Sequence, residues 1–112
     1  MSADEAMLAA QARIFDALGH PLRLRLAGLL LGGELSVASL KALVSASPDL
    51  VTRQLGALHR AGVVRVRRRG GKHYCHLLMH CLPTFLGCTE EMVRQAAKGS
   101  RGGKQAPATP VV

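Results

Sequence analysis

Three cysteines in the last third of the chain are the residues best suited to thiol chemistry. Cys75, Cys81 and Cys88 follow the spacing C-x5-C-x6-C. Three thiolates suit a trivalent metalloid such as arsenite or antimonite, or another thiophilic ion such as cadmium or lead. Two of the thiols could instead form a redox or persulfide sensor, and all three could simply be small buried apolar side chains. If Cys81 and Cys88 share a helix they stand about 10 Å apart, so a shared ion needs a folded-back loop or a second subunit.

A run of basic residues precedes these cysteines. Between Val51 and Lys72 the sequence contains seven basic residues and no acidic one: Arg53, Arg60, Arg65, Arg67, Arg68, Arg69 and Lys72. If these side chains share a face, they predict salt-sensitive binding to phosphates. The alternative is a basic surface that is only solvated.

Two short helices joined by a tight turn must position the first part of this run. Ser36 can cap one helix, whose apolar residues are Val37, Leu40 and Leu43. Ser47, Pro48 and Asp49 form a strong start for the next helix, which Gly62 ends. Gly56 inside this helix costs about 1 kcal/mol relative to Ala, which suggests close packing there.

The second of these helices has the side chains to read bases. Thr52, Arg53 and Gln54 stand near its start, where a helix in a major groove presents donors to base edges. Arg suits guanine, and Gln suits adenine. We therefore predict that its first turns contact DNA, through Ser47, Pro48, Asp49, Thr52, Arg53 and Gln54.

Two basic-apolar runs around Gly70-Gly71 predict a β-hairpin after this helix. Residues 63–69 and 72–78 both alternate in polarity, as expected for strands with one buried face. A basic hairpin beside a groove-reading helix can reach phosphates or the minor groove. The residues that we expect to do so are Arg67, Arg68, Arg69, Lys72 and His73.

Further helices flank this central region. Residues 5–18 carry an apolar stripe at helical spacing, which could face a second subunit or the chain's own core. A mostly buried helix is expected from Pro21 to Gly32, although its start alternates like a strand. The last helix is expected at Pro83–Ala97. Residues 1–97 then make one domain, and residues 98–112, which are rich in Gly, Pro and Ala, are expected to be disordered.

The composition narrows the possible functions. The 112 residues suit one domain, and a net charge of +8 favours a polyanionic partner, nucleic acid before an anionic membrane surface. No apolar run approaches the roughly 18 residues that would span a bilayer. Three cysteines cannot all pair within one chain, which favours a reducing, cytoplasmic location. The sequence shows no recognisable catalytic Cys/His or Ser/His/Asp spacing and no phosphate-binding loop, so we do not expect an enzyme.

Longer motifs resemble a known family. The segments LGHPLRLRLAGLLLGGELSVASL and SPDLVTRQLGALHRAGVVRVRRRGGKHYCHL are similar to the ArsR/SmtB family of winged-helix repressors. Thr52-Arg53-Gln54-Leu55 stands where that family has Ser-Arg-His-Leu. The resemblance implies a mainly α winged helix-turn-helix with a β-hairpin wing. It further implies a homodimer built on the first and last helices, which binds operator DNA without any cofactor and is released by an inducer.

The inducer site differs from the family's best-known one. That site uses two cysteines in a GELCVCDL motif, where this chain reads GELSVASL. A second family zinc site needs a His after His80, and none follows. The working hypothesis is therefore a cytoplasmic repressor whose inducer binds Cys75, Cys81 and Cys88, with arsenite or antimonite favoured and a soft metal ion next. The alternatives are a thiol redox or persulfide sensor and a constitutive DNA-binding protein.

Overall fold

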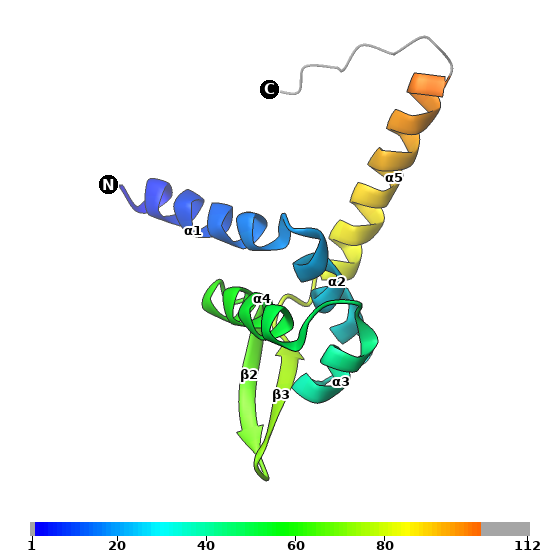
Figure 1. Cartoon of the computed structure of the whole chain (residues 1–112). Coiled ribbons are helices and arrows are strands. Elements are labelled where there is room, and N and C mark those ends of the chain that lie inside the picture. The colour runs from blue at the N-terminus through cyan, green and yellow to red at the C-terminus, as the bar shows by residue number, and fades with distance from the viewer. Residues whose placement is uncertain (1, 102–112) are drawn as a thin grey trace. The chain divides into compact units, whose positions relative to one another are not determined.

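The computed structural model describes residues 2–101 (Figure 1). These residues divide into two units, and the boundary falls between His80 and Cys81. The first unit contains α1 (Ala3–Leu18), α2 (Pro21–Leu29), the 3-10 turn η1 (Leu30–Gly32), β1 (Leu35–Ser36), α3 (Val37–Leu43), α4 (Pro48–Arg60), β2 (Val64–Arg69) and β3 (Lys72–Leu77). The second contains α5 (Leu82–Arg101).

The two N-terminal helices begin at polar caps. Ser2 and Glu5 form a reciprocal capping box, so α1 starts at Ala3 rather than at residue 5. His20 caps α2, because its Nδ1 accepts a hydrogen bond from the backbone N–H of Leu22 at 3.2 Å. The strand-like alternation at the start of this segment is overridden by the cap and by Pro21 at the first helical position.

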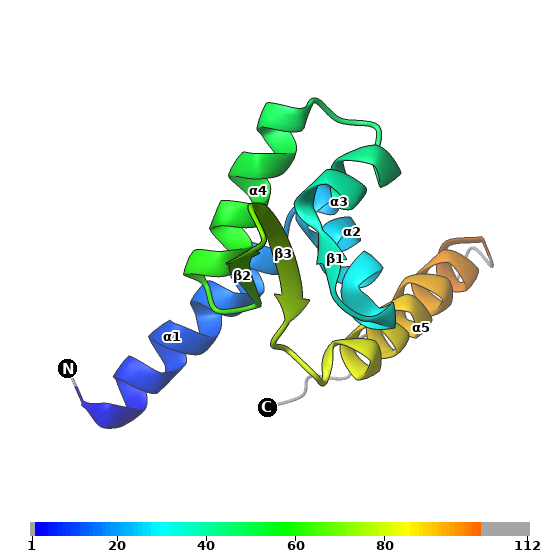
Figure 2. The same cartoon turned by 90° about the horizontal axis from the view of Figure 1, so that it is seen from below.

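The predicted helix-turn-helix is confirmed. α3 begins after Ser36, and the Ser36 Oγ accepts from the N–H of Ser39 at 3.0 Å. α4 begins after Ser47, whose Oγ accepts from the N–H of Leu50 at 3.2 Å. α3 and α4 pack against each other, and they also contact β3 and β2 respectively (Figures 1 and 2). These contacts place the hairpin directly beside α4.

The hairpin is part of a three-stranded antiparallel sheet with the order β1-β3-β2. Arg69 pairs with Lys72 across a two-residue turn, in which Gly70 and Gly71 have φ values of 59° and 78°. Two successive positive φ angles are the requirement of the tight hairpin turn, and Gly meets it without steric cost. β1 was not predicted, because a strand of two residues has too few positions to show a period.

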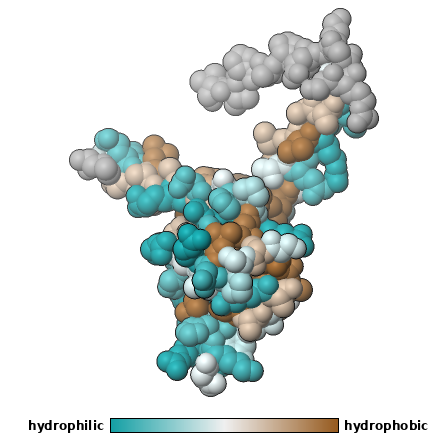
Figure 3. All heavy atoms as spheres, in the orientation of Figure 1, coloured by the Kyte–Doolittle hydropathy of each residue, from teal (hydrophilic) through white to brown (hydrophobic). Residues whose placement is uncertain are grey.

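The core of the first unit lies between its helices and one face of the sheet. Its fully buried side chains come from α2, α3, α4, the strands and the loop before β2, and the largest are Leu26, Leu40, Leu58, Val51, Val63, Val64 and Cys75. Hydrophilic residues gather at the free end of the hairpin (Figure 3). The apolar side chains therefore hold the hairpin at its base and leave its basic end in solvent.

The second unit is described as one helix. α5 runs from Leu82 to Arg101, so it extends past the predicted end at Ala97. The rest of the tail that we expect to be disordered, residues 102–112, lies outside the described residues. None of the helices that the structure describes combines the length and the apolar character needed to cross a bilayer.

Candidate DNA-binding surface and thiol sites

One face of α4 is buried, and the other is open to solvent. Val51, Leu55 and Leu58 point into the core. Thr52 and Arg53 are exposed one and two residues after Val51, so they lie in the second turn of the helix and face outward. The Thr52 hydroxyl donates to the backbone carbonyl of Pro48 at 3.1 Å. Its oxygen can still accept a hydrogen bond.

Three of the predicted contact residues form the exposed start of this helix. Ser47 is the cap, Pro48 occupies the first turn, and Asp49 is the acidic residue that faces the positive helix end. The Ser47 side chain already bonds the helix backbone. Its role is therefore to set where α4 begins, which in turn fixes the directions of Thr52 and Arg53.

Gln54, also in the second turn of α4, is engaged in a contact within the protein. Its side chain is half-buried, and its Oε1 accepts a hydrogen bond from the Nε of Arg23 on α2 at 2.5 Å. The same guanidinium donates through an Nη atom to the backbone carbonyl of Ala17 on α1 at 3.4 Å. Gln54 thus ties α4 to α2 and, through Arg23, to α1. The contact of Gln54 with adenine stays a prediction, and in this structure the side-chain oxygen is already bonded to Arg23.

The register of the hairpin separates its basic residues onto two faces. Directly paired residues of antiparallel strands project to the same side of the sheet. Arg67 pairs with Tyr74, and their face is the one opposite the core. Arg68 pairs with His73 on the other face, which continues from the pair of Val66 and Cys75. The predicted wing contacts therefore do not form a single stripe.

Arg69 is bound within the protein. Its guanidinium pairs with the Glu34 carboxylate at 2.9 Å and stacks on the Tyr74 ring, 4.2 Å from the centroid. The hydrogen bond and the charge of Glu34 raise the pKa of Arg69 above its ordinary value. Arg67, Arg68 and Lys72 are exposed, and none of the ion pairs found among residues 2–101 includes them. These three side chains are thus better placed than Arg69 to meet a phosphate.

The cysteines occupy contrasting environments. Cys75 on β3 is completely buried, and burial, together with the nearby charge of Glu34, raises the pKa of its thiol to about 11. Near neutral pH this sulfur keeps its proton, so it is a poor nucleophile and a poor metal ligand. Cys81 and Cys88 are exposed. Cys81 immediately precedes α5, and its backbone carbonyl accepts from the N–H of Thr84 at 3.0 Å.

The predicted three-cysteine site finds no support within one chain. Cys75 belongs to the first unit, and Cys81 and Cys88 belong to the second. Across residues 2–101, no three or more His, Cys, Asp or Glu side chains are grouped so that they could hold a metal ion. Cys81 directly precedes α5 and Cys88 lies seven residues later, about 10 Å away by helical rise. At that separation Cys81 and Cys88 of one chain would not share an ion or form a disulfide, so a site that uses both needs a thiol from a second copy.

Known proteins of similar sequence are transcriptional regulators. The biofilm growth-associated repressor of Xylella fastidiosa (strain Temecula1) is 37% identical over 87 residues, which span 71% of this chain and 75% of that protein. The repressor of the same name from Agrobacterium fabrum is 38% identical over 64 residues, 57% of this chain and 55% of that protein. The matched stretches thus cover between about half and three quarters of these relatives. No protein-family profile matches the chain.

Solved structures agree with this likeness. Rv0081 from Mycobacterium tuberculosis has a TM-score of 0.71 and 27% identity, over 84% of this chain and 95% of that one. A homodimeric winged helix-turn-helix domain from Mycobacterium bovis, described as a possible ArsR-family regulator, has a TM-score of 0.73 over 88% and 92% of the two chains. Its 23% identity shows the fold alone.

Together the fold and the relatives define a winged helix-turn-helix transcriptional regulator that binds DNA. Within that class, the chain belongs to the ArsR/SmtB family. The family expected from the LGHPLRLRL opening and the wing sequence is therefore confirmed. α4 corresponds to the recognition helix of this fold, and the β2-β3 hairpin corresponds to its wing.

Proposed function

We propose that this protein is a homodimeric repressor that inserts the exposed face of α4 into the major groove of an operator. The observation that carries the proposal is the arrangement of cations in the first unit. Thr52 and Arg53 face outward from α4, and the adjacent wing carries Arg67, Arg68 and Lys72 outside any described ion pair. This arrangement supports base contacts from the helix and phosphate contacts from the wing.

The test of operator binding is a salt titration. Fluorescence anisotropy would be measured with duplex DNA from the region upstream of the gene, and with a scrambled duplex of equal length. We expect tighter binding to the upstream duplex and a linear fall of the logarithm of affinity with the logarithm of salt concentration. Equal affinity for both duplexes would contradict specific recognition, and affinity independent of salt would contradict the phosphate contacts.

The homodimer is proposed from apolar surface on the two terminal helices. Met7 and Leu8 on α1 are 61% and 65% exposed, and Met92 and Val93 on α5 are 64% and 68% exposed. Large apolar side chains at this exposure favour a protein interface. A homodimeric structure is known for the similar Mycobacterium bovis domain. In this proposal each helix contacts the partner subunit, and the two copies of α4 meet two half-sites of the DNA.

For the inducer, we propose a thiophilic species that acts on Cys81 and Cys88. Both thiols are exposed, whereas the Cys75 thiol is buried and protonated. Arsenite, antimonite or a soft metal ion suits paired sulfurs supplied by two subunits. An oxidant or a polysulfide is the second candidate, and it is favoured by the exposure of both thiols, because oxidation follows accessibility.

A release assay separates these inducers. Arsenite, antimonite, cadmium and polysulfide would be titrated against the protein–DNA complex, with Cys81→Ser, Cys88→Ser and Cys75→Ser in parallel. We expect release to be lost in the first two variants and retained in Cys75→Ser. The thiol mechanism would be contradicted if every reagent still released DNA from the double variant Cys81→Ser/Cys88→Ser. Persistence of the complex under all reagents would favour a constitutive DNA-binding protein.

A further inference from the structure

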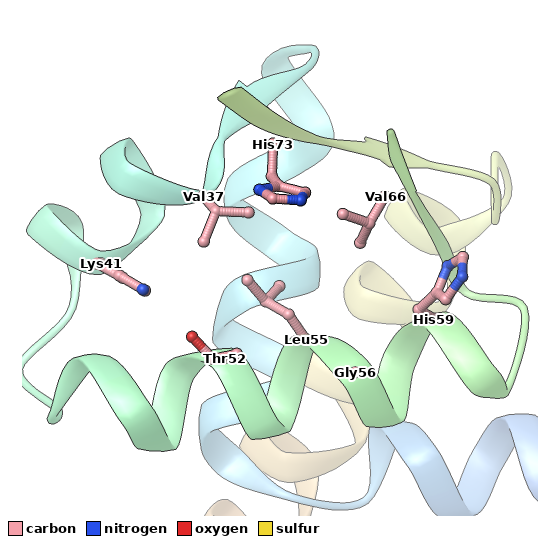
Figure 4. Close-up of a pocket in the computed structure, with 8 residues that line it drawn as sticks. All are labelled: Val37, Lys41, Thr52, Leu55, Gly56, His59, Val66 and His73. Atoms are coloured by element: carbon pink, nitrogen blue, oxygen red, sulfur yellow. The ribbon is translucent and has the colours of Figure 1, made fainter. Parts of the chain in front are cut away.

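A cavity of ≈ 380 Å³ lies between α3, α4 and the hairpin, wholly within the first unit. Its apolar lining comes from three elements, with Val37 on α3, Leu55 and Gly56 on α4, and Val66 on β2 (Figure 4). Pockets for small organic molecules have volumes of roughly 300–1,000 Å³ and are mostly apolar with a few polar groups. This cavity is therefore large enough for a compact ligand.

The polar groups around the cavity favour a negative charge. They come from Lys41, Thr52, His59 and His73, and no carboxylate is among the lining residues. Lys41 and His59 stand at opposite ends of the cavity (Figure 4). The Nδ1 of His59 lies 3.3 Å from the backbone carbonyl of Val64. Since a carbonyl can only accept, a neutral His59 in this contact would present Nε2 as an acceptor, so the positive charge that favours an anion comes from Lys41.

A second hollow adjoins the cavity at the end where Lys41 lies. It measures ≈ 310 Å³ and shares Val37, Lys41 and His73 with the first cavity. Its lining adds Lys72 from the wing and again includes no acidic residue. Two ammonium groups and an imidazole thus border the region where the two hollows adjoin. An anionic group bound there would be attracted by the lysine ammonium groups. No carboxylate among the lining residues would repel it.

We propose that this cavity binds a small organic anion, namely a carboxylate carried on a compact apolar body. The apolar body lies on Val37, Leu55 and Val66, and the carboxylate pairs with Lys41. Thr52 and His73 line the same cavity and belong to the predicted DNA contacts. An occupant therefore competes with the operator. This second step rests on the proposed function, whereas binding of the anion does not.

The first test needs no DNA. 2-Naphthoate and its neutral analogue 2-naphthalenemethanol would each be titrated into the full-length protein by calorimetry and by NMR of the histidine ring protons. We expect the acid to bind about fivefold more tightly than the alcohol, as one partly exposed ion pair allows, and to shift the His59 and His73 signals. Equal affinity for the two compounds would overturn the charge assignment. Binding without a shift of either histidine would overturn the location.

Three variants test the cavity directly. Lys41→Gln is expected to remove the preference for the acid, and Lys41→Arg is expected to keep it. Gly56→Leu is expected to abolish binding, because position 56 lies on the same helix face as Thr52 and His59. A Cβ at Gly56 would meet only the far end of the Arg60 side chain, at 3.2 Å, so the folded state should accommodate this change.

Arg25→Gln is the matched control, since Arg25 is an exposed cation on α2 that does not line the cavity. It should bind 2-naphthoate like the wild type. Undiminished binding to a folded Gly56→Leu, verified by circular dichroism, would overturn the proposal. Equal losses in Lys41→Gln and Arg25→Gln would overturn it too, because they would indicate nonspecific charge attraction.

Competition between the anion and the operator is tested by measuring DNA release. 2-Naphthoate is expected to release the upstream duplex from the wild type at a concentration about fivefold lower than 2-naphthalenemethanol requires. If the anion binds in the cavity and the DNA stays bound, the competition step is wrong and the ligand site stands. If the wild type binds no operator at all, the proposed function fails, and the titration without DNA still decides whether the cavity takes an anion.

Discussion

At the scale of single residues, two exposed arginines are expected to play different parts. Arg53 projects from the second turn of α4, and Arg68 projects from the wing. A helix in the major groove brings its arginine to base edges, whereas a wing arginine meets the phosphate backbone. The chemistry of the two side chains is identical, so only the element that carries each one separates their roles.

Substituting these arginines should produce different losses. Arg53→Ala is expected to cost about 1–3 kcal/mol on the preferred operator and to relax base preference. Arg68→Ala should weaken binding to all duplexes alike and reduce the salt slope by about one. Anisotropy titrations against operator and scrambled DNA at several salt concentrations would measure both effects. If Arg53→Ala lowers affinity for the two duplexes equally, α4 is not reading bases through this residue.

The buried thiol of Cys75 predicts a loss of stability at high pH. The folded protein keeps this proton up to about pH 11, while the unfolded thiol releases it near its ordinary pKa of 9.0. Ionisation therefore costs the fold nothing below pH 9, and it favours the unfolded state increasingly from pH 9 to 11. The free energy of unfolding should fall by about 2–3 kcal/mol over this interval. Urea unfolding at several pH values would measure the fall.

Cys75→Ala is the control for this pH dependence. It should be less stable than the wild type at pH 7, because the smaller side chain leaves a gap in the core. Its stability should then fall less between pH 9 and 11, since other lysine and tyrosine titrations are shared by both proteins. Parallel curves for the two proteins would show that the Cys75 thiol does not resist ionisation in the folded state.

At the scale of elements, the contact of Gln54 with Arg23 orients the recognition helix. It joins α4 to α2, and the second bond of Arg23 reaches the end of α1. A helix held on two neighbouring helices presents its exposed face at a defined angle to the wing. This contact also links α1, one of the two proposed dimer helices, to the element that meets DNA.

The role of Gln54 can be tested by its effect on stability. Gln54→Ala removes the acceptor for the Arg23 guanidinium and should lower the free energy of unfolding by about 1–2 kcal/mol. Gln54→Glu keeps an acceptor and should retain most of the stability. Both variants should keep the base preference of the wild type. An altered base preference with unchanged stability would instead support the original assignment of Gln54 to adenine.

At the scale of the whole molecule, the proposed assembly depends on the two terminal helices. Their exposed apolar residues lie on α1 and α5, outside the helix-turn-helix and the wing. If these helices pair with a second copy, the DNA-binding surface stays free. Two copies of α4 then bind together, which raises operator affinity above that of one copy.

Charged substitutions on these helices should separate the subunits. Leu8→Asp and Met92→Asp are each expected to shift the protein from dimer to monomer and to weaken operator binding by at least about tenfold. Analytical ultracentrifugation would report the mass. Leu31→Asp is the matched control, because Leu31 is 43% exposed on η1, outside both terminal helices. The dimer proposal would be contradicted if all three variants sediment alike.

The sequence by itself was sufficient for the local structure of the DNA-binding unit. Ser36, Ser47 and Pro48 place the helix starts, because capping and a fixed proline φ act within one turn. Gly70-Gly71 places the hairpin turn for the same reason. The family resemblance rested on these local patterns together with the wing sequence. The confirmed features are therefore those governed by interactions between neighbours in the chain.

Only the tertiary structure decided which side chains remain available for binding. Gln54 bonds Arg23, which is 31 residues earlier, and Arg69 pairs with Glu34, which is 35 residues earlier. Cys75 became a buried, protonated thiol because its side chain lies on the sheet face that packs against the core. Gly56 lines a cavity where close packing was expected. These features depend on how elements that are distant in the sequence pack together. Neither hydrophobic periodicity nor a short motif specifies that packing directly.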